Sequence, residues 1–122
     1  ARPGKAFIVA YWSVGCAHCP KELRTLGEFK RRHPQLDVVL VSTDTPAEAQ
    51  EAAQLAAGFG LSHAEQWIFA VDVPEMLRAE IYPRWHGELP RTAFYDRQHR
   101  VQAVSGVVSA QRLQAWLEAN AP

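Results

Sequence analysis

The chain has 122 residues, of which 48% are hydrophobic and 21% are charged. This length and balance are typical of one packed domain and exclude a mainly disordered chain, so we expect a single domain over residues 1–122. Thirteen basic and thirteen acidic residues cancel, which argues against nucleic acid as a partner because no overall positive field would attract it. The longest apolar stretch, Ala6–Trp12, is far shorter than the ~20 residues of a membrane-spanning helix.

The first third of the chain has the pattern of two buried strands joined by a helix. Ala6–Trp12 and Val38–Ser42 are nearly continuous apolar runs with β-branched and aromatic members, which is typical of strands covered on both faces. Between them, apolar residues recur at helical spacing and predict a helix over residues 17–33. A crossover of this length between buried strands makes them parallel, so the predicted fold class is α/β.

The middle of the chain contains three further predicted elements. Thr45–Glu48 combines a capping threonine, a proline at the first helical position and a glutamate at the third. This signal opens an alanine-rich helix that we expect to end near Gly58 or Gly60. Residues 67–70 then predict a short strand, and residues 72–81 a short helix.

The last third of the chain has the pattern of a hairpin followed by a helix. Residues 91–95 and 101–105 flank a polar turn, which predicts two antiparallel strands. Ser109 then precedes a segment with an apolar stripe at helical spacing, so it is expected to cap a final helix.

The chain has only two cysteines, Cys16 and Cys19, and they lie between the first predicted strand and the first predicted helix. Two thiols at this spacing can close a small disulfide ring, and backbone N–H groups at a helix N-terminus stabilise a thiolate. Cys16 lies nearer the helix end and the surface, so we expect it to be the nucleophile. Cys19, one turn inside, is expected to resolve a mixed disulfide by attacking the sulfur of Cys16.

Two other interpretations of the cysteine pair are a zinc site and a purely structural disulfide. A zinc site needs two more ligands, and the sequence has no second cysteine pair and no pair of histidines at finger spacing. A purely structural disulfide across so few residues would close a very small loop, which removes little entropy from the unfolded chain. Both interpretations are therefore less favoured than a redox pair.

Two motifs resemble the thioredoxin superfamily, and more narrowly the exported TlpA- and ResA-like thiol:disulfide oxidoreductases. Tyr11–Glu22 resembles the strand end, the Trp12 that precedes the active site, and the cysteine pair with its following glutamate. Gly87–Asp96 resembles the second signature of the family. The resemblance implies that Pro90 is a cis-proline packed against the disulfide, and that the backbone of Leu89 faces the cysteines and pairs with an extended client segment.

The sequence also departs from the family at several points. Gly15 replaces the tryptophan that usually precedes the first cysteine, which opens the surface beside Cys16. Gly15, Leu89 and Trp12 are the candidates for contact with a client, although Trp12 is expected rather to pack beneath the active site. Ala10 occupies the position where cytosolic thioredoxins bury an aspartate, so that proton-relay group is missing. Pro90 lies 74 positions after Cys16, and the surplus length resembles the extra helix and strand of the TlpA-like branch.

Two residues beside the cysteines are candidates for tuning their chemistry. Glu22 lies one helical turn beyond Cys19 and could take its proton, as the resemblance implies. His18 precedes the second cysteine, as a histidine does in DsbA-like oxidases, and a partly cationic imidazole near Cys16 would favour its thiolate. His18 and Glu22 are also four residues apart, so an ion pair between them would hold the imidazole away from the sulfur. These effects oppose each other and leave the redox direction open.

The sequence therefore predicts a thioredoxin-fold thiol:disulfide oxidoreductase without a bound cofactor, more in the manner of a TlpA- or ResA-like reductase. A DsbA-like oxidase and a non-catalytic, metal-carrying thioredoxin-like module are the alternatives. The resemblance implies client proteins with cysteines, such as apocytochromes or copper-site proteins, and a membrane thiol donor. Since the chain begins at Ala1 and its only methionine is Met76, we expect a processed segment of a periplasmic or otherwise exported protein, with any anchor upstream.

Overall fold

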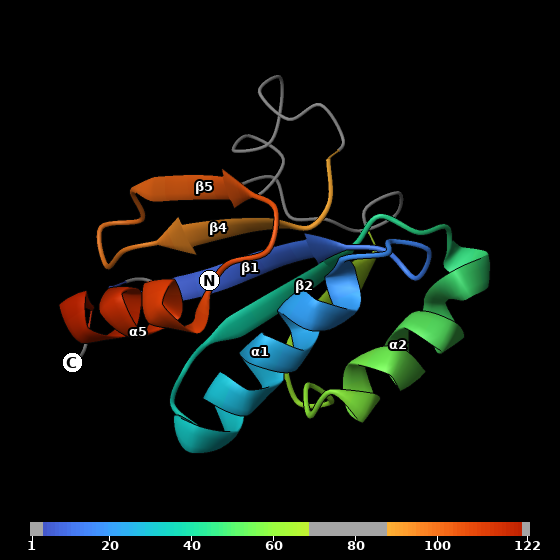
Figure 1. Ribbon diagram of the computed structural model, residues 1–122, viewed down its shortest axis with the longest axis horizontal. Coiled ribbons are helices and arrows are strands. Elements are labelled where there is room, and N and C mark those ends of the chain that lie inside the picture. The colour runs from blue at the N-terminus through green and yellow to red at the C-terminus, as the bar shows by residue number, and fades with distance from the viewer. Residues whose placement is uncertain (1–3, 69–87, 121–122) are drawn as a thin grey trace.

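The computed structural model describes residues 4–68 and 88–120, which form a sheet with three helices (Figure 1). In chain order the elements are β1 (Phe7–Trp12), α1 (Cys19–Arg32), β2 (Val38–Ser42), the 3₁₀ turn η1 (Pro46–Glu48), α2 (Ala49–Gly58), β3 (Glu65–Ile68), β4 (Arg91–Tyr95), β5 (Val101–Ser105) and α5 (Ala110–Ala119). The predicted helix over residues 72–81, the end of the strand predicted over residues 67–70, and most of the surplus between the two motifs lie outside the described residues.

The sheet has five strands in the order β3-β2-β1-β4-β5. β1 pairs in parallel with β2, and β2 with β3, whereas β4 runs antiparallel to both β1 and β5. Both the predicted βαβ unit and the predicted hairpin are therefore confirmed, and the α/β class with them. β1 lies at the centre of the sheet, so the cysteine-bearing loop that follows it leaves from the middle of the sheet edge.

The two faces of the sheet carry separate clusters of buried side chains. Ile8, Ala10 and Trp12 of β1 point toward the helices and pack with apolar residues of α1, α2 and α5. The alternate residues of β1 belong to a second cluster on the opposite face. Every residue of β1 and β2 is buried, which confirms that these two strands are covered on both faces.

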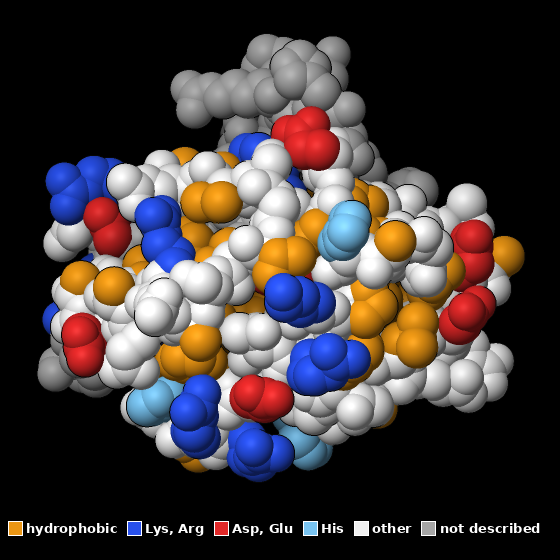
Figure 2. All heavy atoms as spheres, viewed as in Figure 1, with side chains coloured by type: hydrophobic (Ala, Val, Ile, Leu, Met, Phe, Trp, Pro, Cys, Tyr) orange, Lys and Arg blue, Asp and Glu red, His pale blue; other side chains and the backbone are white. Residues whose placement is uncertain are grey.

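Helix α1 begins at Cys19 and ends at Arg32, two residues later than predicted at its N-terminus. The difference arises because residues 16–18 belong to the disulfide ring, which follows a turn in which the Cys16 amide donates to the carbonyl of Ser13 at 3.3 Å. Pro20 lies in the first turn, where a helix needs no amide hydrogen bond. Basic side chains gather over the exposed face of α1 (Figure 2).

Helix α2 begins as the capping signal predicts, although its first turn is a 3₁₀ turn. The Thr45 amide donates to the carboxylate of Glu48 at 2.9 Å, and α2 then runs to Gly58. Strand β3 begins at Glu65, two residues earlier than predicted. Its first residues are polar, and it lies at the end of the described sheet, so an apolar run does not mark its start.

The second half of α1 packs very closely against the residue that follows α2. A Cβ atom built on Gly27 would lie 1.7 Å from the carbonyl oxygen of Phe59, well inside any possible contact. Only glycine fits this crossing, because any side chain would force the two backbones apart. No helix among residues 4–68 and 88–120 has the length and apolar character needed to cross a membrane.

Candidate active site

The cysteines lie where the central strand gives way to helix α1. Cys16 and Cys19 form a disulfide with their Cα atoms 5.4 Å apart, a usual separation for such a bridge. Cys19 is fully buried, whereas Cys16 is partly exposed. This asymmetry agrees with the predicted roles of an accessible nucleophile and a buried resolving thiol.

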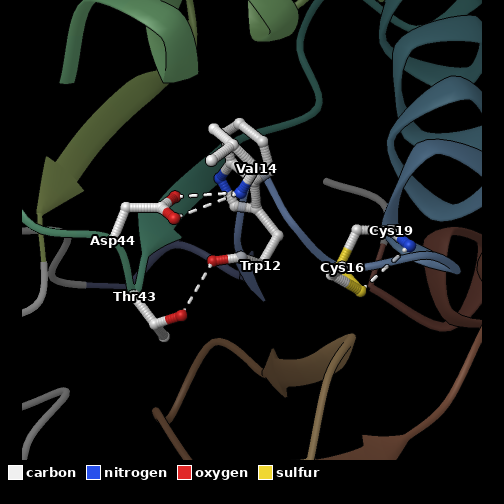
Figure 3. The surroundings of a disulfide bond; sticks show 6 residues. All are labelled: Trp12, Val14, Cys16, Cys19, Thr43 and Asp44. Atoms are coloured by element: carbon white, nitrogen blue, oxygen red, sulfur yellow. Dashed lines mark hydrogen bonds between the residues drawn. A yellow bond between two sulfur atoms is a disulfide. The ribbon is translucent and has the colours of Figure 1, made fainter. Parts of the chain in front are cut away.

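The sulfur of Cys16 lies at the N-terminus of α1. The backbone amide of Cys19, the first residue of the helix, donates a hydrogen bond to this sulfur at 3.1 Å (Figure 3). Amide hydrogens at a helix start stabilise negative charge. The same geometry in the reduced protein would favour a thiolate at Cys16 rather than at Cys19.

The chain around the disulfide ring is exposed to solvent. Gly15, Ala17 and His18 are all exposed, and a Cβ built on Gly15 would meet no atom within 4 Å. The predicted opening of the surface beside Cys16 is therefore present. His18 occupies the N-cap position of α1 without making a side-chain cap.

Glu22 is a buried carboxylate rather than a solvated residue of the helix surface. It is 1% exposed, and it accepts hydrogen bonds from the Thr92 hydroxyl at 2.5 Å and from the Val108 amide at 2.8 Å. Burial raises the pKa of Glu22, and these two hydrogen bonds oppose the increase. The carboxylate therefore points into the protein toward β4 and the segment before α5, and its hydrogen bonds are not with His18.

The second sequence motif, around Leu89 and Pro90, packs against the core that contains Cys19. The Leu89–Pro90 peptide bond is cis, as predicted, and Pro90 is buried. The carbonyl of Pro90 accepts a hydrogen bond from the Gly106 amide at 2.8 Å. Leu89 is half-buried and packs against the core cluster that contains Cys19.

Trp12 does not offer a surface for contact with a client. It is 2% exposed and belongs to the same core cluster as Cys19, so its place among the substrate-contacting candidates is not supported. Its carbonyl accepts hydrogen bonds from the Thr43 amide at 2.8 Å and the Thr43 hydroxyl at 3.3 Å (Figure 3). The residue fixes the end of β1 rather than the surface around the sulfur atoms.

Asp44, which follows strand β2, lies near the site although no sequence motif indicated it. Its carboxylate accepts hydrogen bonds from the amide of Val14, two residues before Cys16, at 3.0 Å and from the Ser42 hydroxyl at 2.6 Å. The available signal was its position, because polar residues at the carboxyl ends of adjacent parallel strands meet at one edge of the sheet. Among residues 4–68 and 88–120, no three potential metal ligands of the His, Cys, Asp or Glu type lie together.

Comparison with known proteins identifies the fold through structure rather than sequence. No protein-family model and no curated protein sequence matches the chain. It is similar in structure to a secreted disulfide oxidoreductase of Mycobacterium tuberculosis, homologous to E. coli DsbE, with a TM-score of 0.71 and 18% identity over 97% of this chain and 84% of that one.

Two further solved structures extend the comparison. StoA from Bacillus subtilis has a TM-score of 0.68 and 18% identity, over 93% of this chain and 83% of StoA. A DsbF homologue from Corynebacterium diphtheriae has a TM-score of 0.66 and 23% identity, over 97% of this chain and 73% of its own. Together with the strand order, these similarities show that the chain has the thioredoxin fold.

Proposed function

We propose that this protein is a thiol:disulfide oxidoreductase that exchanges disulfides with exported client proteins. The observation that carries the proposal is the Cys16–Cys19 disulfide at the start of α1, with one partly exposed and one buried sulfur. The structural neighbour from Mycobacterium tuberculosis, which is described as a secreted disulfide oxidoreductase, supports both the activity and the exported location.

The reductive direction of the reaction uses the two thiols in turn. The Cys16 thiolate attacks one sulfur of a client disulfide, the other client sulfur leaves as a thiolate, and a mixed disulfide joins client to protein. The Cys19 thiolate then attacks the sulfur of Cys16. This step forms the Cys16–Cys19 bond and releases the second client thiolate, so the client gains two electrons and the protein loses two.

Glu22 is the group that we propose accepts the proton of Cys19 before the second step. It lies one helical turn from Cys19 on the same helix, and burial raises its pKa toward that of a thiol. A base works best when its affinity for the proton approaches that of the group it deprotonates. In the opposite direction, the same carboxyl group would return the proton to Cys19.

The client is proposed to bind along the loop of Leu89 and Pro90, next to the open surface at Gly15. Within the described residues, no hydrogen bond to the backbone of Leu89 is found. A free N–H and C=O at the end of a sheet can pair with an extended segment, as in strand addition. Gly15 leaves space for the side chains of such a segment beside Cys16.

The direction that we propose is reduction, with electrons supplied by a membrane thiol donor, as the resemblance to TlpA and ResA implies. An oxidase like DsbA is the second candidate, and the position of His18 favours it. His18 is exposed at the N-cap, and the hydrogen bonds of Glu22 are to other partners. The pairing that would hold the imidazole away from the Cys16 sulfur is therefore not found among the described residues, and a positive charge at this position would favour the Cys16 thiolate and with it the reduced form.

Reduction of insulin by dithiothreitol tests the activity directly. The parent protein should accelerate precipitation of the insulin chains, whereas Cys16→Ser should not. Cys19→Ser should accumulate a mixed disulfide through Cys16, because the resolving thiol is missing. Equal insulin rates with the parent and with Cys16→Ser would exclude the proposed activity.

The reduction potential decides between the two directions. Equilibration with glutathione buffers should give a value near the ~−270 mV of thioredoxin for a reductase, against ~−120 mV for an oxidase of the DsbA type. A value near the second figure would replace the reductase by the oxidase while leaving the disulfide exchange itself unchanged.

A further inference from the structure

Asp44 makes hydrogen bonds that its place in the chain does not explain. It directly precedes Thr45 and the turn η1, and an aspartate near a helix start usually caps that helix. Thr45 is instead the N-cap, and the carboxylate of Asp44 points back to the loop after β1 (Figure 3). Both of its oxygens lie within hydrogen-bond reach of the Val14 amide, at 3.0 and 3.3 Å.

The side chain of Asp44 is also held by Ser42, within its own segment. The Ser42 hydroxyl donates to the carboxylate at 2.6 Å and accepts from the Asp44 amide at 3.1 Å. Asp44 is also buried, with 9% of its surface exposed. A buried carboxylate with two backbone or hydroxyl donors has a single well-defined position, so it can transmit that position to Val14.

Besides the bond from Val14 to Asp44, the loop that contains Cys16 is held by partial packing of Val14 and Cys16 against the core and by the disulfide to Cys19. Ser13, Val14 and Cys16 are only partly buried, and Gly15 and Ala17 are exposed. Among the backbone groups of residues 13–17, one hydrogen bond is found, from the Cys16 amide to the Ser13 carbonyl, and it is long at 3.3 Å. The hydrogen bond from the Val14 amide to Asp44 is therefore the polar tether between this loop and the end of β2.

We propose that Asp44 is a positioning residue that sets the reactivity of Cys16 by fixing the loop at Val14. This inference rests on the proposed function and adds to it a residue outside both sequence motifs. Together with the bond from Thr43 to the Trp12 carbonyl, Asp44 attaches the end of β2 to both sides of Ser13. The sulfur of Cys16 is thereby kept within reach of the Cys19 amide, the donor that stabilises its thiolate.

A direct effect of the negative charge would have the opposite sign. A carboxylate near a thiol disfavours the thiolate, so its removal should make Cys16 more reactive. Loss of the tether should make Cys16 less reactive, because the Cys19 amide would no longer be aligned with the sulfur. The direction of the change therefore separates positioning from simple electrostatics.

The test measures alkylation of Cys16 by iodoacetamide in the reduced full chain as a function of pH, with each cysteine quantified by peptide mass spectrometry. Asp44→Ala should slow the reaction near neutral pH by about threefold to tenfold, the size expected for loss of one hydrogen bond, and should move the profile to higher pH. Asp44→Asn should stay near the parent, because its amide oxygen still accepts from Val14.

Two further variants make the result decisive. Glu51→Gln removes an exposed carboxylate from α2 and should leave the profile unchanged. Ser42→Ala keeps the carboxylate of Asp44 but removes the hydroxyl that donates to it, so it should slow alkylation by less than Asp44→Ala does. If Asp44→Ala does not fold, Ser42→Ala takes its place in the test.

Three results would overturn the proposal. Faster alkylation in both Asp44 variants would show a charge effect, and a slowed Asp44→Asn would show that an acceptor at this position is not sufficient. A lower melting temperature with an unchanged profile would show a structural role only. Because alkylation needs no client, it tests Asp44 even if the parent fails to reduce insulin, which would count against the proposed function alone.

Discussion

The first turn of α1 and its third turn lie against the same core, yet their contacts differ in kind. The first turn contains Cys19, which packs in the apolar core, and Glu22. Their polar atoms make hydrogen bonds to the Cys16 sulfur, to the Thr92 hydroxyl and to the Val108 amide. The third turn contains Gly27, which touches the backbone of Phe59 and leaves no free space. One helix therefore combines a chemical end, which holds the disulfide and a hydrogen-bonded buried carboxylate, with a packed end that is held by a close backbone contact.

The strongest test of this division is Gly27→Ala. The added methyl group would collide with the Phe59 carbonyl, so the free energy of unfolding should fall by about 3 kcal/mol or more. In the fraction that remains folded, alkylation of Cys16 should keep the parent rate. Chemical denaturation measures the first quantity and mass spectrometry the second.

Gly58→Ala is the matched control, because a Cβ at this helical position would meet nothing within 4 Å. Its stability should rise by about 0.5 kcal/mol, since alanine is the better helix former. An equal loss of stability in both variants would mean that the close approach at Gly27 is not the cause.

The second prediction concerns the chemical end alone. In the reduced protein near neutral pH, Cys16 should be alkylated at least about tenfold faster than Cys19, because exposure and the N-terminal amide both favour it. Peptide mass spectrometry after short reaction times measures both rates. A faster reaction at Cys19 would reverse the roles assigned to the two thiols.

A smaller effect is expected at Glu22. Because burial raises the pKa of Glu22 above its ordinary value of 4.5, the folded protein holds this proton more tightly than the unfolded chain. The resulting stabilisation is present below the ordinary value and is lost as the pH rises through the folded value. Relative to the parent, Glu22→Gln should therefore gain stability as the pH rises.

Thermal unfolding of both proteins from acidic to mildly alkaline pH measures this difference. Glu51→Gln, which alters an exposed glutamate of α2, should follow the parent at every pH. A stability difference between Glu22→Gln and the parent that does not vary with pH would show that Glu22 titrates equally in the folded and unfolded chains.

The smallest effect is predicted for His18. Its imidazole is exposed, and water screens its charge, so His18→Ala should slow alkylation of Cys16 by no more than about twofold. Glu22→Gln should leave this rate unchanged, since the carboxylate bonds to Thr92 and Val108. A faster rate in Glu22→Gln would revive the ion pair between residues 18 and 22.

Local pattern was sufficient to predict much of the fold. The apolar runs of β1 and β2 and the polar turn between β4 and β5 are properties of neighbouring residues, and the cysteines mark the junction that follows β1. Strand β3 was placed too late because its backbone pairs with β2 while its first side chains are polar. The pairing of Glu65 and Gln66 with β2 depends on the neighbouring strand, and no local pattern reports it.

The candidate site was predictable only as far as its motifs extend. Cys16, Cys19 and the cis peptide bond at Pro90 follow from spacing and resemblance. The partners of Glu22 and the role of Asp44 depend on contacts between distant segments. A sequence pattern cannot show which amide a carboxylate will meet across the sheet, and so the burial of Glu22 and its separation from His18 emerged from the structure.

The hydrogen bonds of Glu22 also bear on when the site is complete during synthesis. Its two donors follow it by 70 and 86 residues, although both cysteines precede it. Because the chain is synthesised from its N-terminus, its two thiols are exposed long before the Glu22 carboxylate has its hydrogen-bond donors. Until Val108 has emerged, Cys16 and Cys19 are two neighbouring thiols on an unfinished chain, and the hydrogen bonds of Glu22 are complete only when the segment before α5 is in place.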